Sequence, residues 1–131
     1  MLDATQEFAS ARVRAEREVV PGDVPAAITN LFDHYELRGD GVLLLLGQES
    51  WEPRAAKITS QGRSIHRSWV EHAFAPLLAD TAEPGRGEIL DLLVVACDVY
   101  TWKLLRRDRQ LGRNDAESRV LRLVTSILQG A

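Results

Sequence analysis

Three histidines and one cysteine are the residues of this chain best suited to metal binding or acid–base chemistry. His66 and His72 lie six residues apart, which places them on different sides of a helix, whereas a chelating pair on one helix is spaced by four. A metal site would need His34 or Cys97 to join them from another part of the chain. We therefore interpret the histidines as partly exposed or bonded to neighbours, and we predict neither a metal nor a cofactor.

Sequence motifs of the common enzyme classes are absent from the chain. It has no Walker phosphate loop, no dinucleotide-binding glycine pattern, no HExxH and no CxxC. The segment Gly62–His66 is similar to the nucleophile elbow of serine hydrolases, but that motif requires a glycine where His66 lies and a strand-to-helix turn. Because this segment lies inside a helical pattern, we predict that the protein is not an enzyme.

Asp98 interrupts an apolar run that extends from Leu92 to Cys97. A buried carboxylate is costly unless it is paired, so its position has two interpretations. Asp98 either lies on a narrow polar stripe and is satisfied locally or by solvent, or meets an arginine across a dimer interface. Acidic side chains are rarely fully buried, which favours the first interpretation.

Aromatic and small residues on the predicted helix faces could form the wall of a binding pocket. Trp69 and Tyr100 each carry a polar atom that needs a partner, so they suit a pocket wall as well as a plain core. Gly62 costs about 1 kcal/mol relative to alanine in an exposed helix. A close backbone approach or room for a ligand would explain a glycine at this position.

Length and composition indicate one globular domain. The 131 residues, of which 45% are hydrophobic and 27% charged, are enough to bury a single core, so we expect one domain over residues 1–131. The formal net charge of −3 is not the basic excess of a nucleic-acid binder. The arginines of the segment 106–109 suit the end of a helix, so we expect no direct contact with nucleic acid.

The chain has the features of a cytoplasmic protein that does not contact the membrane. Its apolar runs are too short to span a bilayer, and its first residues lack the basic and apolar regions of a signal peptide. Its single cysteine, Cys97, cannot form a disulfide within the chain. We therefore expect a cytoplasmic location.

Apolar residues recur at spacings of three and four along the chain, and glycine and proline divide this pattern into six predicted helices. Asp23 is predicted to cap the second helix, and Asn114 with Glu117 has the spacing of a capping box at the start of the sixth. No alternating strand pattern is present, so the predicted class is all-α, a six-helix bundle-like domain. The helices are expected at about 2–20, from 24 through 35, around 42–46, and at 53–78, 87–109 and 115–129.

The last two predicted helices carry more apolar surface than a monomer of this size needs. The helix at 87–109 has two apolar faces, and a helix with two apolar faces must contact two partners. This surplus predicts a surface for a second subunit, most simply in a two-fold homodimer.

Two segments resemble the effector-binding domain of TetR-family transcriptional regulators. Residues 63–75 read RSIHRSWVEHAFA, and residues 97–108 read CDVYTWKLLRRD before a final amphipathic helix. The resemblance covers nearly the whole chain. It implies a helical body that binds a small, mainly apolar ligand, and a dimeric four-helix interface formed by the last two helices of each subunit.

The resemblance also implies which residues carry these roles. Near the ligand it places Tyr35, Leu43, Leu46, Trp51, Gly62, Ile65, His66, Trp69, Cys97 and Tyr100. At the dimer interface it places Val95, Val99, Trp102, Val120, Leu121, Val124 and Leu128.

Regulators of this family begin with a three-helix head that reads DNA, and no segment of this sequence matches such a head. The resemblance therefore implies that DNA is contacted only through a missing head, whether the chain is truncated or a natural headless relative. Two other functions stay open. One is a headless dimerisation or antagonist module, and the other is a small helical metabolite-binding protein or enzyme in which His66, Asp98 and Tyr100 converge.

Overall fold

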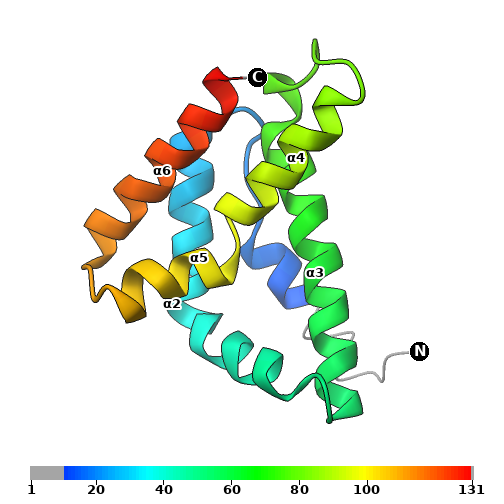
Figure 1. Ribbon diagram of the computed structural model, residues 1–131, viewed down its shortest axis with the longest axis vertical. Helices are drawn as coiled ribbons and strands as arrows, with labels where there is room; N and C mark the ends of the chain where they lie inside the picture. The colour runs from blue at the N-terminus through cyan, green and yellow to red at the C-terminus, as the bar shows by residue number, and fades with distance from the viewer. Residues whose placement is uncertain (1–10, 131) are drawn as a thin grey trace.

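The computed structural model describes residues 11–130, and within this range the chain forms helices and turns without a strand (Figure 1). The predicted all-α class is therefore confirmed. Residues 11–16 are helical, and residues 1–10 of the predicted first helix lie outside the described residues. The helices are α2 (Val24–Gln48), α3 (Pro53–Phe74), α4 (Gly85–Ala96), α5 (Val99–Lys103) and α6 (Arg113–Gln129). A 3₁₀ turn, η1 (Ala75–Leu77), follows α3, and a π-helical turn, η2 (Leu104–Asp108), follows α5.

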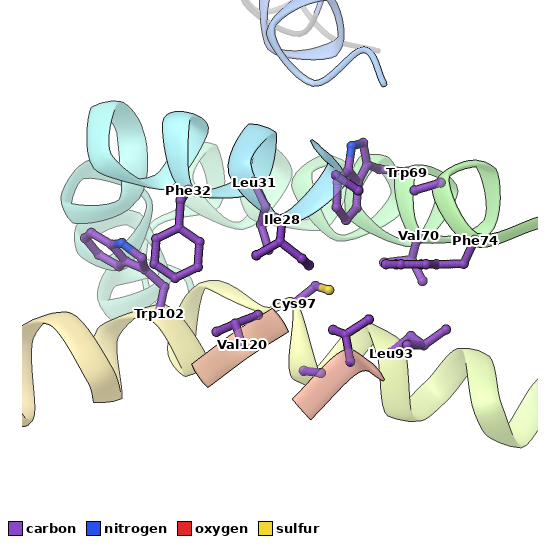
Figure 2. Close-up of a cluster of buried hydrophobic side chains, with 14 of the residues drawn as sticks. Ile28, Leu31, Phe32, Trp69, Val70, Phe74, Leu93, Cys97, Trp102 and Val120 are labelled. Atoms are coloured by element: carbon purple, nitrogen blue, oxygen red, sulfur yellow. The ribbon is translucent and has the colours of Figure 1, made fainter. Parts of the chain in front are cut away.

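The core lies where α2 and α3 face α4 and α5, and α6 packs against both α2 and α4 (Figures 1 and 2). Its largest fully buried side chains come from all of these helices: Ile28, Leu31, Phe32, Val70, Phe74, Leu93, Trp102, Val120 and Val124. No helix in the described part of the chain combines the length and the apolar character that crossing a membrane requires.

The start of α2 follows its sequence signal. The Asp23 side chain accepts a hydrogen bond of 3.1 Å from the backbone N–H of Ala26, which satisfies one of the unpaired amides of the first turn. The predicted cap is therefore confirmed. Proline occupies the first turn of α3, where its missing N–H leaves no partner unsatisfied.

The predicted capping box at the start of α6 is wrong. The helix begins at Arg113, and its N-cap residue, Gly112, makes no side-chain cap. Glu117 instead accepts a hydrogen bond of 2.9 Å from the Thr29 hydroxyl on α2, and Arg113 reaches Asp33 on the same helix at 2.6 Å. The polar residues at the start of α6 therefore attach it to α2, a use that local spacing does not reveal.

The second and third predicted helices are one continuous helix, so the predicted break near Gly39 is wrong. The backbone of α2 runs unbroken through Gly39. The absence of a side chain at this position lets the Trp102 ring pack closely against the helix. A Cβ atom there would lie 2.6 Å from the Trp102 ring, well inside van der Waals contact. The indole N–H of Trp102 donates to Glu36 at 2.8 Å, and the Arg107 guanidinium lies 4.7 Å from the ring centre.

The predicted helix at 87–109 is also corrected, because it breaks after α4 at Cys97 and Asp98. Asp98 has an extended backbone and caps α5, accepting a hydrogen bond of 3.0 Å from the backbone N–H of Tyr100. This agrees with the interpretation in which the carboxylate is satisfied locally. An apolar period continues across a single capped break, so periodicity alone misses it.

We predict that Gly39→Ala lowers the free energy of unfolding by about 1–3 kcal/mol. Overpacking against Trp102 outweighs the gain of about 1 kcal/mol in helix propensity. Urea denaturation followed by circular dichroism measures this change. Gly41→Ala in the same helix is the matched control, because a Cβ at Gly41 meets nothing within 4 Å. Equal stabilities of the two variants would contradict the close contact of Gly39 with Trp102.

Candidate ligand-binding cavity

The break between α4 and α5 frees two backbone carbonyls for side chains. In a continuous helix the Asp98 amide would donate to the Val94 carbonyl, but here it donates to the Val95 carbonyl at 3.2 Å. The Val94 carbonyl instead accepts from Nε2 of His66 on α3 at 3.0 Å. The Cys97 carbonyl accepts from the hydroxyl of Tyr35 on α2 at 2.8 Å. Both long helices are therefore hydrogen-bonded to the chain at this break.

A cavity of about 590 Å³ lies next to this break, between α2, α3 and the helical segment at 11–16. This volume falls within the range of small-molecule sites, about 300–1,000 Å³. Aliphatic side chains contribute eight of the twenty residues that line it: Val13, Val42, Leu45, Leu46, Ile58, Ile65, Val94 and Val99. A wall of this kind favours a ligand with a large apolar part.

Arg17 enters the cavity from the end of the first described helical segment and is only 6% exposed. Its Nη2 atom donates to Nδ1 of His66 at 3.1 Å. Its guanidinium carbon lies 4.7 Å from the Trp69 ring centre and 5.9 Å from that of Tyr35, so aromatic faces surround the charge. Burial lowers the pKa of Arg17, although an arginine stays charged at neutral pH.

His34 and His66 line the cavity as neutral imidazoles. Burial, followed by repulsion from Arg17, lowers the pKa of each to about 4. His66 is therefore the Nε2–H tautomer, which donates to the Val94 carbonyl and accepts from Arg17. His34 Nδ1 lies 3.7 Å from a Glu16 oxygen and makes no hydrogen bond.

The cavity contains no activated nucleophile among the residues described above. Burial raises the pKa of the nearby Cys97 thiol to about 12, so this cysteine stays protonated and unreactive. Burial also raises the pKa of the Tyr35 hydroxyl, which is held as a donor to the Cys97 carbonyl. Within residues 11–130, no three histidine, cysteine or acidic side chains are grouped to hold a metal ion.

The structure brings six of the ten predicted ligand residues to this cavity: Tyr35, Leu46, Gly62, Ile65, His66 and Tyr100. Leu43 packs against the core, and Cys97 is fully buried within it. Trp51 is 69% exposed in the turn between α2 and α3. Trp69 is buried beside Arg17 and lines a second, more open hollow of about 420 Å³.

Sequence reasoning missed the polar residues that give the cavity its character, above all Arg17 and His34. Arg17 lies outside the apolar stripe of its predicted helix, where a charged residue is normally solvent-exposed. Only the packing of its helical segment against Tyr35 and Trp69 buries it. No local signal in the sequence could have identified it.

The residues predicted for the dimer interface have three different environments in the structure. Val95 is 65% exposed, and Leu121 and Leu128 are half-buried. The remaining four lie in the core of the same chain, so that their burial needs no partner: Val99, Trp102, Val120 and Val124. Periodicity identifies apolar faces but not which of them packs against α2 and which stays free.

Comparisons with known proteins give no match: no family model, no curated protein and no solved structure is significantly similar to the chain.

The two buried histidines predict a loss of stability as the pH falls from about 6.5 to about 4. In this window the unfolded chain binds a proton at each imidazole and the folded chain does not. The free energy of unfolding therefore falls by up to about 2.7 kcal/mol per pH unit. Urea denaturation at a series of pH values measures this slope.

Replacement of one buried imidazole separates this effect from the titration of carboxylates. His34→Gln should reduce the slope between pH 6.5 and 4.5 by about half, because one of the two protons is removed. His72→Gln is the control, because this exposed histidine does not line the cavity. The same slope in His34→Gln and the wild type would show that His34 is not buried as a neutral group.

Proposed function

We propose that the protein binds a small, mainly apolar molecule in the cavity between α2 and α3, as the sensor domain of a TetR-like transcriptional regulator. One observation carries the proposal. A cavity of about 590 Å³ combines eight aliphatic side chains with polar groups fixed by the fold, among them Arg17, Tyr35 and His66. Apolar side chains together with convergent polar groups are typical of a ligand site.

The size of the cavity supports a binding role because protein interiors are close-packed. Voids larger than a water molecule are few in an ordinary core. Here, side chains such as Phe32, Val70 and Leu93 are fully buried in a core that the cavity does not enter. The cavity lies beside this core, between α2 and α3, and is partly open to solvent.

The position of the cavity also supports a sensor. Its wall includes Val13 and Arg17 from the first described segment, and Val94, Asp98 and Tyr100 on either side of the α4–α5 break. A ligand would therefore contact the first described segment and the α4–α5 break at once. A molecule that binds one arrangement of these segments more tightly shifts the population toward it, and this is how a sensor transmits binding.

We include homodimerisation in the proposal because the C-terminal helices expose aliphatic residues that the core does not use. Leu92 and Val95 on α4 and Leu123 on α6 are each largely exposed. Since α4 and α6 pack against each other, a second copy could cover parts of both helices. This surface is the part of the proposed interface that a monomer leaves free.

The cavity predicts binding of one molecule of N-phenyl-1-naphthylamine, a neutral apolar fluorophore, per chain. Gly62→Leu should abolish the fluorescence increase, because position 62 lines the cavity and faces open space. The variant should remain folded, since leucine has the higher helix propensity. Fluorescence titration measures binding.

Gly47→Leu is the matched control, since this glycine is also helical and also faces open space but does not line the cavity. It should bind the fluorophore like the wild type. Absence of binding to the wild type, or equal binding by Gly62→Leu, would refute the cavity as the ligand site.

The exposed aliphatic surface predicts a dimer that a single charge disrupts. Val95→Asp should give a monomer in size-exclusion chromatography with light scattering, with a melting temperature close to that of the wild type. Burial of an unpaired carboxylate in the interface opposes association. Leu44→Asp, at an exposed leucine on α2, should stay dimeric. A monomeric wild type at tens of micromolar would exclude this part of the proposal.

A further inference from the structure

The arginines that line the cavity differ in one respect, which is whether a carboxylate neutralises them. Four arginine side chains reach the cavity wall, and three of these form salt bridges. The pairs are Arg38 with Glu16 at 2.6 Å, Arg63 with Glu49 at 2.6 Å, and Arg67 with Asp91 at 3.2 Å. The fourth, Arg17, forms no salt bridge with any residue in the range 11–130, although it is the most buried of the four.

The groups in direct contact with Arg17 are neutral. Its Nη2 atom donates to the neutral His66, and the rings of Tyr35 and Trp69 lie against the guanidinium. Its buried Nε atom has no hydrogen-bond partner. Asp98, an acidic group that attracts Arg17, accepts a hydrogen bond from the Tyr100 amide as the cap of α5. A buried cation with an unused donor is costly, and proteins normally pair such a group.

We propose that the ligand of this cavity is an amphipathic carboxylic acid, whose carboxylate pairs with Arg17 and whose apolar chain fills the aliphatic part of the cavity. The inference rests on the proposed binding function and specifies its ligand class. A guanidinium presents parallel N–H donors that match the two oxygens of a carboxylate. The ligand would therefore supply the direct salt-bridge partner that no residue in the range 11–130 provides.

The charge in the cavity favours a carboxylate over a phosphate. A phosphate monoester carries a charge close to −2 at neutral pH, whereas a carboxylate carries −1. Only one cation of the wall is without a carboxylate, the two histidines are neutral, and Asp98 adds a negative charge. Because Asp98 already offsets the charge of Arg17, each negative charge on a ligand adds to the total, and a carboxylate adds about half as much as a phosphate monoester.

His66 acts as a positioning residue in this arrangement. It holds Arg17 through Nδ1 and holds the Val94 carbonyl through Nε2, so that it connects the cation to the break between α4 and α5. An anion that binds Arg17 would therefore act on the end of α4 through a single side chain. This gives the proposed ligand a route to the C-terminal helices, where Val95 is exposed.

Competition against N-phenyl-1-naphthylamine tests the inference with decanoate, decanol and decyl phosphate below their micelle concentrations. The three compounds share one apolar chain and differ in the head group. On the wild type, decanoate should compete at least about tenfold better than decanol, the effect expected for a charge-assisted hydrogen bond. It should also compete better than decyl phosphate.

Arg17→Met removes the charge and keeps an apolar side chain of similar length. It should weaken decanoate competition by about tenfold and leave decanol unchanged. Replacement of a buried charge by an apolar side chain often preserves folding, and circular dichroism verifies this. Arg38→Met is the matched control. It removes a cavity arginine that already has a carboxylate partner, and should change decanoate competition by no more than about twofold.

The outcomes separate this inference from the function on which it rests. If the wild type binds the fluorophore but decanoate and decanol compete equally, ligand binding in the cavity is supported, and the proposal that the ligand is a carboxylic acid is refuted. If decyl phosphate competes best, the ligand class is a phosphate and the inference is overturned. If Arg17→Met and Arg38→Met lose decanoate competition equally, Arg17 has no special role. If the fluorophore does not bind at all, the proposed function fails, and the inference fails with it.

Discussion

The break between α4 and α5 is the feature on which the architecture of this domain depends. A helix that stops inside a core leaves carbonyls without partners, and each must find a donor because buried polar groups without one are costly. Tyr35 and His66 supply these donors from α2 and α3. The two long helices are thereby fixed to the same point of the chain, and the space between them beyond this point becomes the cavity. One local interruption of a helix thus determines both the packing of the core and the place of the candidate site.

The polar residues of the site form one connected arrangement rather than separate contacts. His66 can accept from Arg17 only as a neutral imidazole with its proton on Nε2, and that proton is held by the carbonyl that the break frees. Burial and the charge of Arg17 keep the imidazole neutral. The cation therefore maintains the protonation state of its own acceptor. Arg17 in turn lies between aromatic rings that offer no negative charge, which makes it the group in the cavity that most needs an anion.

Close packing elsewhere makes this site possible. Gly39 allows Trp102 to lie against the backbone of α2, and Glu36 accepts from the indole and from Arg106 at the same place. The α5 and η2 turns are held firmly to α2 as a result, so α4 and α5 meet at a defined angle. Position 62 on α3 shows the opposite use of glycine, since nothing lies near it and the volume stays open. The same residue type serves tight contact on one side of the domain and empty space on the other.

The sequence by itself determined the helical class, the cap at Asp23 and the start of α3, because these follow from periodicity and from local hydrogen bonds. Its resemblance to a known family pointed to Tyr35 and His66, but to only two of the eight aliphatic residues of the cavity, Leu46 and Ile65. The continuity of α2 through Gly39, the break at Asp98, the attachment of α6 through Glu117 and the burial of Arg17 were decided only by the tertiary structure. Each of these depends on a residue distant in the chain, such as Trp102 opposite Gly39 or Trp69 beside Arg17. A local sequence pattern does not indicate which distant side chain will pack against a given residue.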